Sequence, residues 1–243
     1  MILTIDAGNS FVKTAVFEGI TLIQKNVYAH DIFGVELQKL LFLFSNIQNI
    51  IISDVGSGKI KELIQGLDSQ NVTIISRETS LPFKNNYGTP HTLGIDRMVL
   101  AAGAVLRFPN MDRLVIDAGT CVTYDYVTCT DTYLGGAISP GLRLRYQSLH
   151  QHTAQLPLLE RAYPQDNIGC STAESMHSGV VQGLTYEIEG FINNFTINSN
   201  NFIIILTGGD AFFLAKRLKN TIFANSNFLL ESLNLIHIYN AKK

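Results

Sequence analysis

The residues best suited to chemistry lie in two copies of one short motif, Ile-Asp-Ala-Gly, at residues 5–8 and 116–119. In each copy an aspartate ends an apolar run with strand character, and the glycine opens a tight turn to a second strand pattern. Glycine lets a ligand approach the backbone closely, and successive turn amides form a concavity that suits anionic oxygens. An aspartate repels a neighbouring anion unless a cation lies between the two negative charges. The motif therefore predicts two sites that hold a phosphate together with a cation.

The first copy gives the fuller prediction. Asp6 is a candidate to hold Mg²⁺, directly or through water, with Gly8, Asn9 and Ser10 around a phosphate and the positive charge of Lys13 nearby. The alternative is that Asp-Gly turns simply make hairpins. Two copies at matching positions, each starting from an apolar strand, favour the functional interpretation.

A third glycine site, Thr207-Gly208-Gly209-Asp210, follows the apolar run Phe202–Leu206 and precedes a helical pattern. Nucleotides often pack on the backbone of such a strand-to-helix turn, although many of these connections use Gly-Gly only for packing. The sequence has no G-x-x-x-x-G-K-[ST], which excludes a P-loop. It also has no G-x-G-x-x-G that opens a helix, which argues against a dinucleotide fold.

Hydrophobic periodicity predicts the elements that position these motifs. Strand patterns occur at 2–6, 12–18, 21–28, 50–53, 72–75, 113–117, 122–127, 132–137, 203–207 and 235–239. Helical patterns occur at 32–46, 57–67, 92–107, 141–151, 172–194 and 210–219. The stretch Ser76–Thr92 is predicted to be a long loop, and Arg107–Arg113 a hinge. Each half is thus a hairpin-led sheet followed by helices and buried strands, an α/β arrangement of two similar lobes.

Composition limits the class of protein. The 243 residues are 46% hydrophobic and only 16% charged, and the formal net charge is −2. This describes a globular chain with a large core, and the balance of charge gives no general basis for binding nucleic acid. Three widely spaced cysteines make no disulfide framework or metal cluster. The N-terminus lacks a leader pattern, and the apolar runs are too short to cross a bilayer, so a cytoplasmic protein with no membrane partner is expected.

A longer series of segments occurs in one order along nearly the whole chain. It comprises Asp6-Ala-Gly-Asn-Ser-x-x-Lys13, Tyr87, Gly94-Ile-Asp-Arg97, Asp117-Ala-Gly-Thr120, Gly135-Gly-Ala-Ile-Ser-Pro-Gly141, Thr153-Ala-x-Leu-Pro157, Thr172 and Thr207-Gly-Gly-Asp210. This ordered set resembles the type III pantothenate kinases, which are members of the actin, sugar kinase and Hsp70 superfamily. The resemblance implies two similar ribonuclease H-like (actin-like ATPase) lobes, each a mixed sheet flanked by helices, with a nucleotide cleft between them. The expected lobes are residues 1–107 and 108–243.

The resemblance also implies an activity and the residues that perform it. The activity is ATP-dependent phosphorylation of pantothenate at its primary hydroxyl to give 4'-phosphopantothenate, the first step towards coenzyme A. Asp96 is the implied base, a role that suits a carboxylate in phosphoryl transfer. The residues implied to bind ATP are Asp6, Ala7, Gly8, Asn9, Ser10, Phe11, Val12, Lys13 and Thr120. The residues implied to bind pantothenate are Tyr87, Gly94, Ile95, Asp96, Arg97 and Thr172.

Cations and a partner subunit follow from the same resemblance. Asp117 is implied to bind a monovalent cation, K⁺ or NH₄⁺, and Asp6 is the candidate for Mg²⁺. The partners are pantothenate, ATP and a second copy of the chain in a homodimer. Structural alternatives remain for three residues. Asp96 could belong to a solvated or interelement ion pair, Tyr87 could be a packing residue, and Thr172 a helix N-cap.

Some positions depart from the family pattern. Ser10 stands in place of the commoner Thr and keeps the hydroxyl, Cys121 stands in place of a usual Ala, and 52–56 differs from the usual Ser-Val-Val-Pro. Two other functions remain open. One is a non-catalytic nucleotide-binding regulator, like the relatives described as Baf-type transcriptional accessory factors. The other is a kinase, or a phosphatase, of the same fold that acts on another small molecule.

Overall fold

The computed structural model describes residues 1–54, 67, 70–197, 199 and 201–243. The chain divides into two compact units. Unit 1 comprises Met1–Pro109, Asp131–Tyr133 and Asn227–Lys243, and unit 2 comprises Asn110–Thr130 and Leu134–Ser226. The boundary expected between residues 107 and 108 lies near Pro109. The C-terminal segment, however, was expected in the second lobe and groups with unit 1.

Unit 1 contains a mixed five-stranded sheet in the order β3-β2-β1-β4-β5. Its strands are β1 (Ile2–Ala7), β2 (Val12–Glu18), β3 (Thr21–Tyr28), β4 (Asn49–Asp54) and β5 (Asn71–Ile74). The first three strands form an antiparallel meander, whereas β4 and β5 run parallel to β1. The Asp-Ala-Gly turn therefore joins the central strand β1 to its antiparallel neighbour β2.

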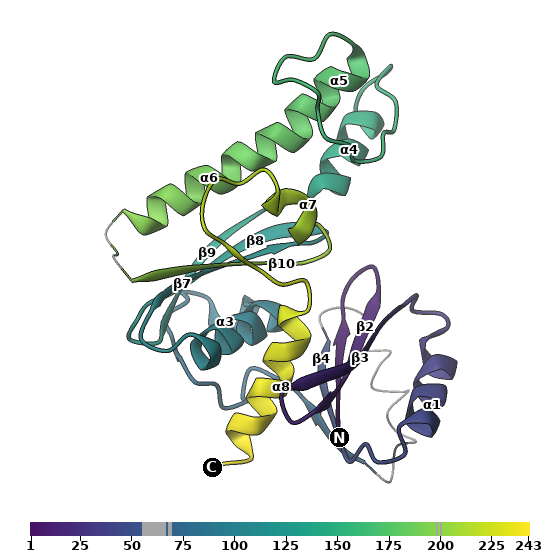
Figure 1. Ribbon diagram of the computed structural model, residues 1–243, viewed down its shortest axis with the longest axis vertical. Helices are drawn as coiled ribbons and strands as arrows, with labels where there is room; N and C mark the ends of the chain where they lie inside the picture. Colours follow the sequence, from purple (N-terminus) through teal and green to yellow (C-terminus); the bar gives the residue numbers. More distant parts are fainter. Residues whose placement is uncertain (55–66, 68–69, 198, 200) are drawn as a thin grey trace. The chain divides into compact units, whose positions relative to one another are not determined.

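Helices cover both faces of this sheet. Helix α1 (Phe33–Leu43) buries Phe33, Leu37 and Leu40 in a cluster with alternate residues of β1 and β4. Helices α3 (Ile95–Arg107) and α8 (Phe228–Asn240) contact each other and β4. The two helices lie side by side in Figure 1. Unit 1 also contains a short strand, β6 (Lys84–Asn85), and a 3₁₀ turn at Pro90–Thr92.

The predicted strand at 235–239 is wrong, because these residues lie within α8. The alternation Ile236-His-Ile238 mimics a strand when it is taken alone. Over the longer segment, however, Leu229, Leu233 and Ile236 recur at helical spacing and are buried. This helix also contacts β1 and β2, where Leu230 packs with Ala15 and Phe17.

Unit 2 is built on a second mixed sheet with strand order β11-β10-β7-β8-β9, at whose edge β6 pairs with the first residues of β9. Its strands are β7 (Asp112–Ala118), β8 (Cys121–Val127), β9 (Thr132–Pro140), β10 (Phe202–Thr207) and β11 (Phe223–Ala224). β7 and β8 are antiparallel, whereas β10 is parallel to β7. The second Asp-Ala-Gly turn thus repeats the position of the first, between a central strand and its antiparallel neighbour.

A long helical segment lies along the sheet of unit 2 in Figure 1. It consists of α5 (Thr172–His177), a π-helical turn at Ser178–Gln182 and α6 (Gly183–Thr196). Its buried residues, such as Val181, Leu184 and Ile188, pack against β7 and β10. Helices α4 (Leu142–Gln151) and α7 (Ala211–Ala215) complete the unit.

The mixed α/β fold with two helix-flanked sheets is confirmed. The helix expected at 57–67 lies outside the described residues except for Leu67. The helix expected at 210–219 is confined to α7. No helix in the described ranges is long and apolar enough to span a membrane.

Candidate functional site

The first Asp-Ala-Gly turn places a buried carboxylate behind an exposed tip. Asp6 is only 4% exposed and lies opposite Lys13 in the β1–β2 ladder, with Lys13 Nζ 3.8 Å from Asp6 Oδ2. The turn is closed by the amide of Gly8, which donates to the carbonyl of Phe11 at 3.1 Å. Asn9 and Ser10, at the tip, are exposed. The backbone of the tip is therefore accessible to an anion, with one acidic and one basic side chain beside it.

The remaining residues of this turn differ in what they can offer a ligand. The side chains of Ala7 and Val12 are each 1% exposed and belong to the core, so they can contact a nucleotide only through the backbone. Phe11 is 47% exposed. Of the residues predicted to bind ATP here, Phe11 thus presents the largest apolar surface.

Sequence reasoning missed His30, which contacts the same turn. Its Nε2 lies 2.9 Å from the carbonyl oxygen of Gly8, a hydrogen bond in which the ring nitrogen is the donor. The signal that could have found it is strand register. Because Val12 pairs with Tyr28 in the antiparallel ladder, residues just after Tyr28 come next to residues just before Val12.

A second group of predicted residues meets at the N-terminus of α3. Gly94 is the N-cap, and the Asp96 carboxylate accepts a hydrogen bond from the amide of Arg97 at 2.8 Å. Arg97 is 5% exposed, and its guanidinium carbon lies 5.7 Å from the centre of the Tyr87 ring. Tyr87 also contacts Tyr133, with ring centres 6.1 Å apart.

This arrangement suits an acidic substrate. A helix N-terminus and a guanidinium both favour an anion, and the planar fork of arginine fits a carboxylate. Tyr87 packs over the Arg97 guanidinium, which is the packing contact left open by the sequence, and its substrate role stays a prediction. Asp96 lies in the first turn of α3 and is partly exposed, so its carboxylate is accessible from solvent.

The second Asp-Ala-Gly turn, in unit 2, gathers two other glycine motifs around it. Parallel pairing of β10 with β7 puts Thr207 beside Asp117. Gly208 has φ of +95°, and a side chain there would collide with the Ala118 carbonyl and the Asp117 carboxylate. The amide of Asp210 then donates to the Ala118 carbonyl at 3.0 Å.

The other side of this turn is held by the end of β9. The amide of Gly141 donates to the carbonyl of Thr120 at 3.0 Å, and Gly119 donates to Cys121 in the same way at 3.0 Å. Thr120 and Cys121 are exposed. The turn thus offers an accessible hydroxyl at Thr120, while its backbone is fixed from two directions.

Thr172 lies elsewhere in unit 2, in the first turn of α5. The N-cap of this helix is Ser171, whose hydroxyl accepts from the amide of Glu174 at 3.3 Å, so capping does not account for Thr172. Thr172 lines an open cavity of about 710 Å³. The other lining residues are Leu149, Leu156, Gly169, Cys170, Ser171, Ser175, Met176 and Gly179.

The two aspartates of the turns differ in their suitability for cations. No group of three or more metal-ligating side chains occurs in the described part of the chain. Mg²⁺ usually keeps several waters and binds one or two carboxylates plus substrate phosphates, so Asp6 alone fits a nucleotide-bound Mg²⁺. Asp117 lies close to the Ala118–Gly208 backbone, and a carboxylate among backbone carbonyls is a set of oxygen donors that fits a monovalent cation.

Two solved structures share this fold over nearly the whole chain. A Campylobacter jejuni protein assigned to the Baf family of transcriptional activators has a TM-score of 0.68 at 23% identity and covers 99% of this chain and 100% of its own. A Listeria monocytogenes protein assigned as an N-acetylmannosamine kinase has a TM-score of 0.55 at 13% identity, and 99% of each chain is covered. At these identities the likeness establishes the fold alone.

Sequence comparisons define the family within this fold. The family model described as "Type III pantothenate kinase" matches residues 2–194. A type III pantothenate kinase of Flavobacterium johnsoniae is 55% identical over 239 residues, 98% of each chain. That of Flavobacterium psychrophilum is 56% identical over 98% of this chain and 99% of its own. That of Christiangramia forsetii is 44% identical over 99% of each chain. The chain belongs to the type III pantothenate kinase family.

Proposed function

We propose that this chain performs the reaction of its family, transferring the γ-phosphoryl group of ATP to the primary hydroxyl of pantothenate. The product, 4'-phosphopantothenate, leads towards coenzyme A. Family membership over nearly the full chain supports the reaction. The observation that carries the residue assignment is the cluster at the start of α3, where Asp96, Arg97 and Tyr87 come together.

In this proposal the ATP phosphates bind the exposed tip of the first turn. The backbone of Gly8, Asn9 and Ser10 provides amide donors, and Lys13 provides positive charge. Phe11 contacts the nucleotide with its exposed ring, and the exposed hydroxyl of Thr120 is the further group proposed to bind ATP. Ala7 and Val12 hold the turn from the core and act only through their backbone.

Pantothenate is an acid, and its carboxylate is proposed to bind Arg97 and the amides of Gly94 and Ile95 at the N-terminus of α3. Tyr87 closes this pocket by covering the guanidinium. Thr172 is the further predicted substrate contact, and it lines its own cavity in unit 2. Because Ser171 is the cap of α5, Thr172 keeps its hydroxyl available for a ligand.

The chemical step needs little covalent help from the protein. The pantothenate hydroxyl oxygen forms a bond to the γ-phosphorus, the bond from that phosphorus to the β–γ bridging oxygen breaks, and ADP leaves. Asp96 accepts the hydroxyl proton as the new bond forms. Lys13 and the turn amides stabilise the charge on the phosphoryl oxygens.

Two cations are proposed to bind, Mg²⁺ at Asp6 and K⁺ or NH₄⁺ at Asp117. When bound, they would neutralise the negative charge of the phosphates and of the carboxylates of Asp6 and Asp117. The family resemblance and the oxygen-rich surroundings of Asp117 support this assignment. A coupled assay in which K⁺ is replaced by Na⁺ tests it, because turnover is expected to fall.

A homodimer in the cytoplasm is also proposed. Exposed apolar side chains on β9 and α6 support a partner surface in unit 2, since Leu134, Ile138 and Tyr186 are 50%, 63% and 54% exposed. Light scattering during gel filtration measures the native mass directly. A mass of one chain at assay concentration contradicts the dimer and leaves the reaction unaffected.

The decisive experiment compares wild type with Asp96→Asn in an assay that follows both ADP and phosphopantothenate. We expect turnover by wild type and a loss of at least about 100-fold in kcat for Asp96→Asn, the usual size of a general-base contribution. Asp166→Asn is a matched control, because Asp166 likewise accepts from the next amide, at 2.6 Å from Asn167, but is exposed. It should behave as wild type. Absence of wild-type turnover with Mg²⁺ and K⁺ present contradicts the kinase and leaves the regulator as the better account.

A further inference from the structure

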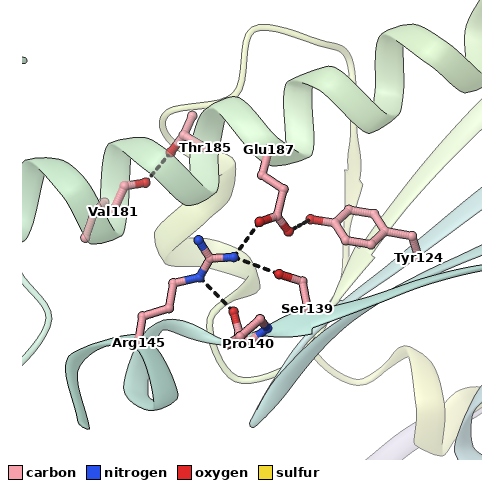
Figure 2. A network of polar contacts seen from close by, with 7 residues as sticks. All are labelled: Tyr124, Ser139, Pro140, Arg145, Val181, Thr185 and Glu187. Carbon is pink, nitrogen blue, oxygen red and sulfur yellow. Dashed lines mark hydrogen bonds and ion pairs between the residues drawn. The ribbon is translucent and has the colours of Figure 1, made fainter. Parts of the chain in front are cut away.

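A polar network in unit 2 joins the Gly135–Gly141 segment to side chains that have no role in the proposed function (Figure 2). Its centre is Arg145 on α4. Arg145 Nε donates to the carbonyl of Pro140 at 2.8 Å, and Nη2 donates to the Ser139 hydroxyl at 2.8 Å and to the Glu187 carboxylate at 2.5 Å. Glu187, on α6, also accepts from the hydroxyl of Tyr124 on β8 at 2.8 Å. One guanidinium therefore ties the end of β9 to α6 and, through Glu187, to β8.

The anchors of this network are firmly held. Tyr124 is fully buried and stacks on Phe191 with ring centres 4.1 Å apart. Burial, together with the hydrogen bond to Glu187, raises the pKa of Tyr124 well above its usual value, so the hydroxyl stays protonated and remains a donor. The side chains of Arg145 and Glu187 are 22% and 25% exposed, so they are partly buried and their opposite charges compensate each other.

The helix that carries Glu187 is itself irregular just before it. The π-helical turn Ser178–Gln182 precedes α6, and the Thr185 hydroxyl donates to the Val181 carbonyl at 2.9 Å (Figure 2). A π turn inserts extra backbone and rotates the following residues about the helix axis. Glu187 lies in α6, the helix that directly follows this turn.

The other end of the network reaches the second Asp-Ala-Gly turn. Ser139 and Pro140 lead directly into Gly141, whose amide donates to the Thr120 carbonyl at 3.0 Å. Gly141 packs so closely on the carbonyls of Gly119 and Thr120 that a Cβ atom has no room there. A shift of the Ser139–Gly141 segment must therefore shift the Gly119–Thr120 turn.

We infer that Arg145 is a positioning residue for the nucleotide, acting through Ser139–Gly141 on the turn that presents Thr120. This inference rests on the proposed role of Thr120 in binding ATP. Lysine cannot replace Arg145, because the network uses two guanidinium nitrogens in fixed and different directions. Arg145→Lys keeps the charge opposite Glu187 but loses the fork that holds both Pro140 and Ser139.

The kinetic test compares Arg145→Lys with Arg143→Lys, an exposed arginine on the same helix. We expect Arg145→Lys to raise KM for ATP about tenfold, which corresponds to ~1.4 kcal/mol, with smaller changes in kcat and in KM for pantothenate. Arg143→Lys should match wild type. Equal changes in both KM values, or a lower Tm with unchanged KM for ATP, overturn the inference, because either result indicates only a structural role.

A second measurement reports the turn directly and does not need turnover. Cys121 follows Thr120 and is exposed. In a Cys129→Ser, Cys170→Ser background, the rate at which Cys121 reacts with a thiol reagent should change in Arg145→Lys and stay constant in Arg143→Lys. An unchanged rate overturns the inference. Calorimetric binding of a non-hydrolysable ATP analogue separates the role of Arg145 from the proposed pantothenate kinase activity. Binding of the analogue tests Arg145 even if pantothenate is not the acceptor.

Discussion

The two Asp-Ala-Gly turns share a sequence and a place in their sheets but differ in what lies opposite the aspartate. In the first, Asp6 pairs across the ladder with Lys13. In the second, the corresponding partner of Asp117 is Thr123. A cationic side chain thus faces one carboxylate, and a neutral hydroxyl residue faces the other.

The supports of the turns differ as well. The carbonyl of Gly8 in the first is held by the side chain of His30, whereas carbonyls of the second are held by backbone amides of Asp210 and Gly141. The second turn is therefore fixed by two further glycine motifs, and the first by side chains. This difference agrees with the proposed assignment of phosphate and Mg²⁺ to the first turn and of a monovalent cation to the second.

The largest effect is expected at the first turn. Asp6→Asn should lower kcat/KM at least about 100-fold, because the carboxylate proposed to hold Mg²⁺ loses its charge while keeping its shape. Steady-state kinetics over a range of Mg²⁺ concentration measures the loss. If the variant is fully active at ordinary Mg²⁺, the two turns do not divide the cations as proposed.

A smaller and different effect is expected at the second turn. Asp117→Asn should reduce turnover in K⁺ about tenfold, or ~1.4 kcal/mol in the barrier, and should remove the difference between K⁺ and Na⁺. The measurement is the rate in each chloride salt at constant ionic strength. A variant that is slower but still stimulated by K⁺ places the cation elsewhere.

Local features of this molecule were predictable from sequence, and long-range ones were less so. The two hairpins could be predicted because each is contained in about twenty consecutive residues with two strand patterns, and the helical pattern at 92–107 is equally local. The grouping of Gly208 and Gly141 around Asp117 depends on β10 lying beside β7. Nothing in the spacing of these motifs specifies that pairing, and only the family resemblance suggested that they act together.

The mistaken strand and the missed residues have related causes. Residues 235–239 of α8 resemble a strand when taken alone, whereas the longer apolar pattern and the packing of α8 on α3 and β1 favour a helix. His30 donates to the carbonyl of Gly8, and Arg145, which donates to the carbonyl of Pro140, is inferred to position the turn at Gly119–Thr120. Every residue has a backbone carbonyl, so the sequence does not show which carbonyl accepts a side-chain hydrogen bond. Positioning residues of this kind are therefore identified only from the structure.

The smallest effect is expected at His30, and it tests whether the first turn depends on a side-chain hydrogen bond. His30→Ala removes the donor to the Gly8 carbonyl and should raise KM for ATP about fivefold, the equivalent of one net hydrogen bond of ~1 kcal/mol. His30→Gln can still donate and should recover part of the loss. Because the first turn is held by this side chain whereas the second is held by backbone amides, the K⁺ response should be the same in all three proteins. If both His30 variants bind ATP as wild type does, the hairpin alone holds the turn, and the contrast between side-chain and backbone support is wrong.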